Sequence, residues 1–410
     1  METADVIVVG GGAAGLATAI FAARRRPERK VLILDSARKL GAKILVSGGG
    51  RCNVTNRVVT EADFRGGSSR FMRRVLRAFR VEQTIAFFEE LGVTLHEEAD
   101  GKLFPDSNRA RTVLEALLVE AERRGVGILT GQRVVSLERH DEGFLVRTPE
   151  QSLVAGRVVL ATGGLSLPKT GSDGRGLDIA ARLGHSVVAT APALVPLVLQ
   201  GDFHRSLAGV SHPVELTVRP ERRPSVRIAG SLLWTHFGVS GPAALDASRF
   251  WCRARLEGSV TTISACLLPG NDFTKTEKRI LAIADERPRM QIQNALGALL
   301  PASVVRAVFG VLEISGESPV GQLGRDERRR VVHALVEWLL PVSDSRGYSF
   351  AEVTAGGIPL EEVDPATMAS RKCPGLYLVG EMLDVDGRIG GFNFQWAWST
   401  GWVAGAAVVE

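Results

Sequence analysis

A glycine pattern near the amino terminus constrains the fold of this chain more than any other feature. Gly10–Gly15 reads GGGAAG, which matches G-x-G-x-x-G. The short β-branched run Val6–Val9 precedes it and predicts a buried strand, while Gly15–Arg26 predicts a helix that Pro27 stops. With Val31–Asp35 as the next buried strand, these segments predict a β-α-β unit that opens an α/β fold.

The same pattern predicts a binding site for a dinucleotide. Gly10 permits the tight turn, Gly12 lets a pyrophosphate approach the backbone, and Gly15 lets the helix pack closely on the strand. The amides and the dipole at the helix start favour the phosphate charge. Asp35 ends the second strand, twenty residues after Gly15, where a carboxylate can accept hydrogen bonds from ribose hydroxyls. An acid there disfavours a 2′-phosphate, so NADP is a poor first ligand for this site.

Composition and cysteine use argue against several other classes of protein. Val6–Ala23 is uncharged and long enough to resemble a membrane span, but its glycines indicate a strand, a turn and a helix instead. The acidic segment Met1–Asp5 before it is wrong for a signal peptide. Hydrophobic residues make up 45% of the chain and charged residues 23%, and the net charge of +5 is too small to favour nucleic-acid binding. No C-x-x-C pair and no His cluster accompany the four cysteines, so we expect no disulfide, no metal site and a cytoplasmic location.

A second candidate site is the stretch Lys39–Asn56, KLGAKILVSGGGRCNVTN. Gly48–Gly50 would let the backbone pass close to a flat ring. Arg51 can stabilise an anionic reduced flavin or an acidic substrate. Cys52 is either a redox thiol or an inert packed residue, and the second is the more common role for a lone cysteine. Lys43 is interpreted as a phosphate contact or a surface charge.

Two further strand ends carry polar and glycine residues. Ala161–Gly164, ATGG, follows a buried strand that would return beside the first one. Near the carboxyl terminus, another buried strand ends at Gly380–Glu381, and Asp386 follows. Carboxylates in this position can bind polyol hydroxyls. The start of an apolar helix at Gly390–Asn393 can offer its amides and dipole to a flavin carbonyl, although an ordinary strand end and a packed helix would show similar patterns.

These stretches together resemble the BaiN/YhiN-type FAD-dependent oxidoreductases, often called aminoacetone-oxidase-like flavoproteins, and the resemblance covers essentially the whole chain. It is carried by DVIVVGGGAAGLATAI, KLGAKILVSGGGRCNVTN, VVLATGGLSLPKTGSDGRG, PALVPL and GLYLVGEMLDVDGRIGGFNFQWAWSTG. The resemblance implies one FAD per chain, bound noncovalently, with the adenine near Val134, the ribose at Asp35, and the ribitol and ring near Gly380–Asn393. The residues that we expect to contact FAD are Gly10, Gly12, Ala13, Ala14, Gly15, Asp35, Lys43, Gly49, Gly50, Arg51, Cys52, Asn53, Val134, Ala161, Thr162, Gly163, Gly380, Glu381, Asp386, Gly391, Phe392 and Asn393.

The expected architecture is a Rossmann-like, glutathione-reductase-like FAD-binding domain interrupted by an insertion. Residues 1–190 and 346–410 would form the FAD-binding domain, in which residues 70–91 are helical. Prolines punctuate short alternating segments after residue 191, so residues 191–273 predict an inserted β-rich domain, which the resemblance implies is β-barrel-like. Residues 274–345 are patterned as helices and would form a helical domain.

The expected function is transfer of a hydride between FAD and a small organic substrate. A second G-x-G-x-x-G on its own strand and helix is absent, so NAD(P)H would bind transiently as the electron donor. An oxidase that uses oxygen and a non-catalytic or RNA-associated flavoprotein are the alternatives. The row Arg70, Arg73, Arg74 and Arg77 is a solvated helix face or contacts an anionic partner. We expect residues 191–345 to cover the flavin and select the substrate, and Arg51 to be the main polar contact to that substrate. No histidine has a clear catalytic partner in the sequence. The sequence leaves the oligomeric state open.

Overall fold

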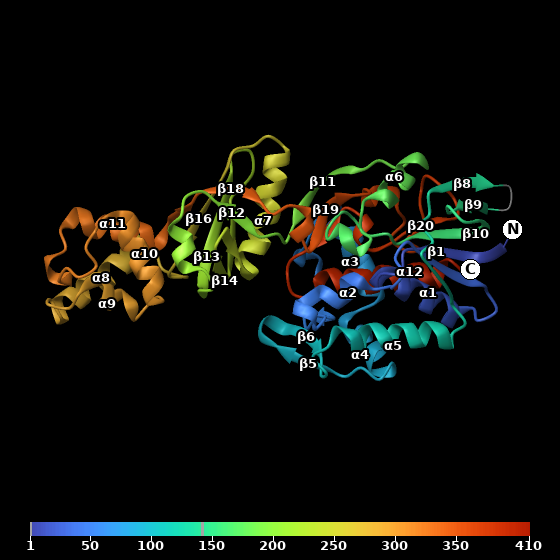
Figure 1. Cartoon of the computed structure of the whole chain (residues 1–410), viewed down its shortest axis with the longest axis horizontal. Helices are drawn as coiled ribbons and strands as arrows, with labels where there is room; N and C mark the ends of the chain where they lie inside the picture. Colours follow the sequence, from blue (N-terminus) through green and yellow to red (C-terminus); the bar gives the residue numbers. More distant parts are fainter. Residues whose placement is uncertain (1, 141–142) are drawn as a thin grey trace. The chain divides into compact units, whose positions relative to one another are not determined.

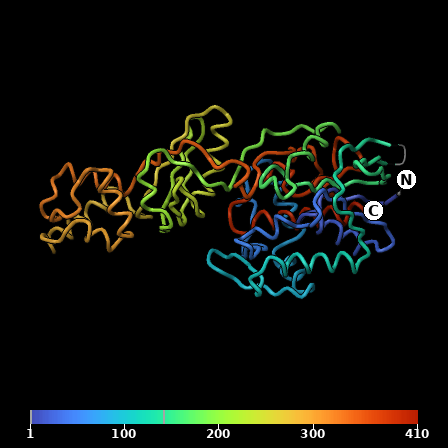
Figure 2. Tube along the Cα trace, viewed as in Figure 1, coloured from blue at the N-terminus to red at the C-terminus, as the bar shows by residue number. Residues whose placement is uncertain are grey.

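The chain divides into two compact units. The structure, a computed structural model, describes residues 2–140 and 143–410. Unit 1 comprises Met1–Pro192 and Glu352–Glu410, and unit 2 comprises Ala193–Ala351. The backbone leaves unit 1 once and returns to it once, so both ends of the chain belong to unit 1 (Figure 2).

The centre of unit 1 is a mixed sheet with strand order β7-β2-β1-β10-β9-β8, to which β20 adds by pairing with β10. The five strands β7, β2, β1, β10 and β20 run parallel, β9 pairs antiparallel with β10, and β8 pairs antiparallel with β9 (Figure 1). Their bounds are β1 Glu2–Val9, β2 Val31–Asp35, β7 Gly127–Thr130, β8 Ser136–His140, β9 Gly143–Arg147, β10 Ser152–Leu160 and β20 Leu376–Leu378.

Two helices from opposite ends of the sequence pack together in unit 1. Helix α1 (Ala13–Arg25) follows β1, and α12 (Phe392–Ala407) is the last helix of the chain. Trp396 and Trp398 of α12 are buried, whereas Trp402 is only partly buried and packs against the same core. Because α1 and α12 form one extensive contact, the last helix completes the core that the first β-α-β unit begins.

The helix expected over residues 70–91 is wrong in one respect, because two helices cover this stretch. Helix α3 (Ser69–Ala78) ends before Phe79, and α4 (Val81–Glu90) begins after Arg80. The carbonyl of Phe79 accepts hydrogen bonds from Gln395 Nε2 at 3.0 Å and Ser399 Oγ at 2.9 Å. Side chains of α12 thus satisfy an oxygen that a continuous helix would have used.

Unit 1 contains further strands and helices outside this central sheet. They include three small sheets, β3-β6-β5, β21-β4 and β11-β19. Their bounds are β3 Thr55–Asn56, β4 Phe64–Gly66, β5 Leu95–Glu98, β6 Lys102–Pro105, β11 Val188–Ala193, β19 Val353–Gly357 and β21 Val385–Gly387. The other helices are α2 Ala42–Val46, α5 Ala110–Arg123 and α6 Arg175–Arg182.

Unit 2 combines a strand-rich part with a group of helices. Its sheet has the order β17-β16-β13-β14-β15-β12-β18, and α7 (Gly241–Leu256) packs on β13 and β14. The other strands are β12 Leu197–Leu199, β13 Ser211–Pro220, β14 Val226–Thr235, β15 Gly238–Ser240, β16 Thr261–Cys266, β17 Trp338–Leu340 and β18 Val342–Ser345. The helical group consists of α8 Phe273–Glu286, α9 Ile292–Gly297, α10 Ala302–Leu312 and α11 Arg325–Val336. Across residues 2–140 and 143–410, no helix is long and apolar enough to cross a membrane.

Candidate functional site

Three of the stretches predicted to contact a nucleotide meet at one edge of the sheet in unit 1. The parallel strands β1, β2, β10 and β20 all end there, because parallel neighbours present their carboxyl ends on the same side. The amide of Gly10 donates to Leu34 O at 2.8 Å, and the amide of Ala161 donates to Val9 O at 2.8 Å. Fold topology therefore brings together the glycine turn, Asp35, the segment after β10 and the segment after β20.

The three glycines of the pattern have different structural roles. A Cβ on Gly10 would lie 2.5 Å from Ala161 O, and a Cβ on Gly15 would lie 1.9 Å from Gly10 O, so close packing of backbone requires both glycines. A Cβ on Gly12 would meet no protein atom within 4 Å, and its φ of −82° suits any residue. The fold itself does not need a glycine at position 12, whereas close approach of a pyrophosphate does.

Asp35 is held in place by the backbone around it. Its Oδ2 accepts a hydrogen bond from Gly11 N at 2.7 Å, and its Oδ1 accepts one from Ala37 N at 2.7 Å. Each carboxylate oxygen has a second lone pair. The side chain is therefore oriented and keeps acceptor capacity for a pair of hydroxyl groups.

We expect Asp35→Ala to purify with less FAD, because the ribose loses a charge-assisted acceptor worth about 1.5–3 kcal/mol, or roughly ten- to a hundredfold in affinity. The measurement is FAD released by acid precipitation, followed by titration of the apoprotein with FAD. Asp5→Ala is a matched control, because Asp5 also accepts a backbone amide, from Lys30 N at 2.8 Å, but lies in the first half of β1, away from the strand ends. Equal FAD affinities for the two variants would contradict the role of Asp35.

The stretch that contains Val134 is tied to the same strand end. The amide of Gln132 donates to Asp35 O at 2.8 Å, and the amide of Val135 donates to Arg147 O at 2.9 Å. Val134 is buried between these two anchors. Val134 therefore lies on a segment whose backbone is hydrogen-bonded to Asp35, so the residues expected near the adenine and the ribose are neighbours in the structure.

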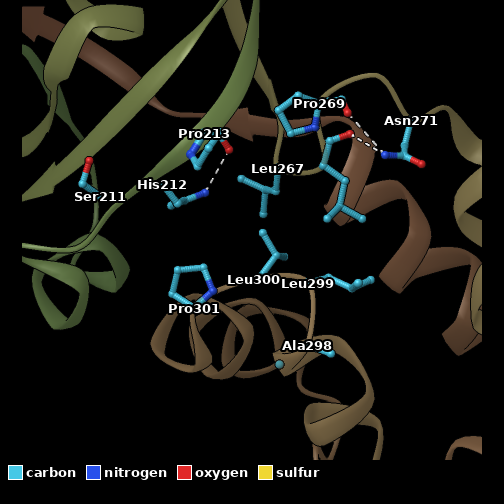
Figure 3. A pocket seen from close by; sticks show the side chains of 12 residues that line it. Ser211, His212, Pro213, Leu267, Pro269, Asn271, Ala298, Leu299, Leu300 and Pro301 are labelled. Atoms are coloured by element: carbon cyan, nitrogen blue, oxygen red, sulfur yellow. Dashed lines mark hydrogen bonds between the residues drawn. The ribbon is translucent and has the colours of Figure 1, made fainter. Parts of the chain in front are cut away.

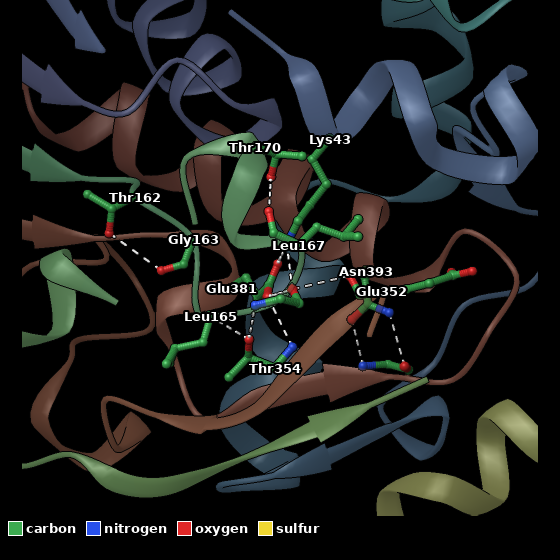
Figure 4. A network of polar contacts seen from close by, with 12 residues as sticks. Lys43, Thr162, Gly163, Leu165, Leu167, Thr170, Glu352, Thr354, Glu381 and Asn393 are labelled. Carbon is green, nitrogen blue, oxygen red and sulfur yellow. Dashed lines mark hydrogen bonds and ion pairs between the residues drawn. The ribbon is translucent and has the colours of Figure 1, made fainter. Parts of the chain in front are cut away.

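A network of polar groups joins four segments at the same edge (Figure 4). Lys43 Nζ, from α2, donates to Glu381 Oε2 at 2.5 Å and to Ser166 Oγ at 2.7 Å. Ser166 Oγ donates to Glu381 Oε1 at 2.6 Å, and Thr354 N donates to the same oxygen at 3.0 Å. Two of the three donors of Lys43 are used in this network.

Sequence reasoning identified Lys43 and Glu381 but missed Ser166 and Thr354. Ser166 is fully buried, and its amide donates to Thr354 Oγ1 at 3.0 Å across 188 residues of sequence. A serine in a loop and a threonine in a strand carry no local signal that predicts such a contact. Thr162 and Gly163 lie on the same segment after β10, where Gly163 adopts a left-handed φ of 73°.

Arg51 does not present a free charge. Its guanidinium forms two hydrogen bonds with Glu98, at 2.6 and 3.3 Å, and stacks on the Phe104 ring at 4.1 Å from the centroid. The pairing with Arg51 holds the pKa of Glu98 below its ordinary value. Gly49 and Gly50, just before Arg51, are exposed and adopt left-handed φ values of 68° and 84°. The turn is therefore a glycine turn as expected, but the charge of Arg51 is compensated.

Cys52 has the character of a packed residue rather than of a redox thiol. Its side chain is fully buried, and burial raises the pKa of the thiol to about 12. We expect Cys52 in the native protein to react with iodoacetamide about a thousandfold more slowly than an ordinary thiol near pH 8, because its thiolate fraction is smaller by about that factor. Mass spectrometry of timed samples measures this. Cys266, which is less buried, is the internal comparison, and labelling of Cys52 at an equal rate would contradict the prediction.

Two glycines precede the start of α12, and the buried side-chain amide of Asn53 lies beside them. Gly390 and Gly391 adopt left-handed φ values of 124° and 93°, and the helix start has no side-chain cap. A Cβ on Gly391 would lie 2.9 Å from Asn53 Oδ1. Among the described residues, this buried Asn53 oxygen has no hydrogen-bond partner. An uncapped helix start beside an unsatisfied acceptor suits a ligand that offers both acceptors and a donor.

The other expected residues of this segment shape its backbone. Asn393 Oδ1 accepts from Gly387 N at 2.8 Å, and its Nδ2 donates to Gly387 O at 3.0 Å, so the side chain closes the turn before α12. Phe392 is fully buried and packs edge-to-face on Phe64 at 6.3 Å. Asp386 is buried on β21. On the neighbouring segment, a Cβ on Gly380 would lie 2.8 Å from Ala14 Cβ, so Gly380 lies against the first turn of α1.

Unit 2 contains a cavity of about 550 Å³ between β13, the loop 267–271 and residues 297–301 (Figure 3). His212, which lines it, accepts from Trp234 Nε1 at its Nε2 at 3.1 Å. Its Nδ1 therefore carries the proton, which it donates to Pro213 O at 3.1 Å. Burial lowers the pKa of His212, so the ring stays neutral and both nitrogens are used. The wall residues otherwise are mainly apolar, and His212 has no nitrogen left for catalysis.

Parallel strands with a G-x-G-x-x-G turn, an acid at the end of the second strand and open space beside Gly12 define a dinucleotide-binding protein with a Rossmann-like fold. The chain belongs to the HI0933-like protein Rossmann domain family, which matches residues 4–407, and it is an FAD-dependent oxidoreductase. The resemblance and the α/β fold class inferred from sequence are confirmed.

Similar proteins cover nearly the whole chain. The 3-dehydro-bile acid delta(4,6)-reductase of Clostridium scindens is 34% identical over 403 residues, 98% of each chain. The ribosomal RNA dihydrouridine synthase of Escherichia coli is 34% identical over 405 residues, 98% of this chain and 97% of that protein. The solved 3-ketosteroid-delta4-(5alpha)-dehydrogenase of Rhodococcus jostii is 17% identical with a TM-score of 0.50 and covers 100% of this chain and 97% of that one, which is a likeness of fold.

Proposed function

We propose that this oxidoreductase reduces a carbon–carbon double bond conjugated with a carbonyl group, and that NAD(P)H supplies the electrons. One observation carries the proposal. Two relatives that are 34% identical over nearly their whole length are named for saturating such a bond, one in a 3-dehydro-bile acid and one in uridine to give dihydrouridine. In both substrates a carbonyl activates the double bond for addition of a hydride at the β-carbon and a proton at the α-carbon.

The residues of unit 1 suit the nucleotide half of FAD. The amides at the start of α1, with the open side of Gly12, would take the pyrophosphate. Asp35 would accept hydrogen bonds from the ribose, and the backbone beside Val134 would contact the adenine. Ala13 and Ala14 form the first turn of α1 and allow the same close approach. Glu381, at the end of β20, would bind ribitol hydroxyls.

The residues around α12 suit the pyrimidine edge of the flavin. That edge presents a carbonyl, an N–H donor and a second carbonyl. The uncapped amides after Gly391 can donate to a carbonyl, and the unsatisfied Asn53 Oδ1 can accept from an N–H. Bound FAD would supply the two-electron chemistry that the side chains lack. The third donor of Lys43 remains for an anionic or carbonyl oxygen of the cofactor or the substrate.

The test is an anaerobic experiment on the FAD-loaded protein that follows flavin absorbance. NADH or NADPH should bleach the flavin, and a 3-keto-4,6-diene bile acid or a uridine-containing RNA should restore the colour. Each substrate should gain two hydrogens, which mass spectrometry measures as a mass increase. Rapid recovery with oxygen and none with either substrate would favour an oxidase instead. A flavin that neither nicotinamide reduces would contradict NAD(P)H as the donor.

A further inference from the structure

We propose that the arginine face of α3, defined as Arg70, Arg73, Arg74 and Arg77, binds the phosphate backbone of RNA. All four side chains are exposed. They lie on the outer side of the helix, because Phe71, Met72, Val75 and Leu76 form its buried side. The proposal rests on the proposed function in one respect, because an RNA bound here would present a uracil as the substrate.

The charges of the arginine face are largely uncompensated. Within the described residues, Arg73 forms an ion pair with Glu61 at 2.6 Å, whereas Arg70, Arg74 and Arg77 have no carboxylate within 4 Å. Arg73, and from a greater distance Arg77, lower the pKa of Glu61. Helix α3 itself contains no acidic residue. Like charges spaced three and four residues apart repel each other on a helix surface. A row of four therefore opposes helix stability, and an anionic ligand would relieve that repulsion.

The geometry favours phosphates over other anionic surfaces. Residues 70 to 77 span about 10 Å along a helix, which is long enough to meet successive phosphates of one strand. Guanidinium groups bind phosphate oxygens in pairs, with two parallel hydrogen bonds. Insertion of α3 into a bilayer is not available, because an inserted helix needs a free apolar face and the apolar side of α3 is buried in the protein core.

The arginine face is built on the same scaffold as the start of α12 (Figure 1). Helix α3 packs against α12. The strand before it, β4, pairs with β21, and β21 leads into the turn at Gly390 and Gly391. The Gly67 amide also donates to Asp384 O at 2.9 Å. A phosphate backbone held by α3 would therefore be held by unit 1, the unit that contains every residue assigned to FAD.

The experiment measures binding of a fluorescently labelled RNA stem-loop, with uridines in its loop, to the FAD-loaded full chain by anisotropy at several salt concentrations. The test variant is R70Q/R74Q/R77Q, and the matched control is R25Q/R26Q/R29Q, which removes the same charge from arginines that already pair with Glu410, Glu28 and Asp5. The test variant should bind at least about tenfold more weakly, and its slope of log affinity against log salt should fall by about 2–3. The control should bind like the wild type.

Equal losses in the two variants, or wild-type binding by the test variant, would overturn the proposal. Tighter binding of polyglutamate or of anionic lipid vesicles than of RNA would overturn the choice of partner. FAD content and flavin bleaching by NAD(P)H, measured on the same samples, should match the wild type in both variants. Those readings test the proposed function separately, because they do not involve RNA.

Discussion

Gly12→Val should fold normally and bind almost no FAD. The backbone at Gly12 has an ordinary φ of −82°, and a Cβ there would meet no protein atom within 4 Å, so the apoprotein has no reason to be destabilised. A branched side chain would occupy the space through which a pyrophosphate reaches the amides of α1. We expect the affinity for FAD to fall more than about a thousandfold, which corresponds to about 4 kcal/mol.

FAD content after purification and circular dichroism of the apoprotein measure the two halves of this prediction. Gly310→Val in α10 is the matched control, because a Cβ on Gly310 also meets no atom within 4 Å, but this glycine lies in unit 2. Gly15→Ala should behave differently and fail to fold, since its Cβ would lie 1.9 Å from Gly10 O. A yellow Gly12→Val protein would contradict the assignment of the glycine pattern to the FAD site.

Unit 1 without unit 2 should still bind FAD. Every residue that we assign to the cofactor lies in unit 1, and the sheet, α1 and α12 are complete without Ala193–Ala351. Strand β11 ends at Ala193 and pairs with β19, which begins at Val353. A Cβ on Gly356 would lie 2.6 Å from Ala189 O, and Ser186 N, before β11, donates to Glu362 Oε2, after β19, so the two strands run in opposite directions and the two ends left by the deletion lie close together. A short Gly/Ser linker from Pro192 to Glu352 should therefore join them.

The deletion protein should be yellow, and the same protein carrying Gly12→Val should be colourless. That pair of results would show that FAD occupies the assigned site in the deletion protein. Bound FAD is measured after gel filtration and acid release. A colourless or insoluble deletion protein would contradict the prediction, because unit 1 would then depend on unit 2. Turnover of an enone by the yellow protein tests the separate expectation that residues 191–345 select the substrate.

The parts of the fold that could be predicted from sequence are those that local patterns determine. The buried strand before Gly10 and the helix after it follow from residue type and spacing alone, and the family and the oxidoreductase class are confirmed by the comparisons. The direction of parallel strands then places Asp35 beside the glycine turn. The roles of the individual FAD residues remain predictions, because no ligand contact has been observed for them.

The rest could not be predicted, because it depends on contacts between distant residues. Glu98 neutralises Arg51 from a strand that is 47 residues away, so a charge that looks available in the sequence is already paired. The side chains of Gln395 and Ser399, more than 300 positions away in the sequence, donate hydrogen bonds to the carbonyl of Phe79. This carbonyl lies where the helix ends, although local propensity favours a continuous helix there. Packing against α12 favours that break, and Gln83 Oε1, which accepts a hydrogen bond from Arg80 N at 2.9 Å, caps the start of α4.

The order of the segments has a consequence for how the protein matures. Strand β20 and helix α12 lie after all of unit 2 in the sequence, yet they complete the core around α1. During synthesis on the ribosome, the side of α1 that α12 covers, which includes Ala17 and Phe21, stays uncovered until α12 has been made. Glu381 and the start of α12 also arrive last. The nascent chain therefore cannot assemble the assigned FAD site until nearly all of it has been translated.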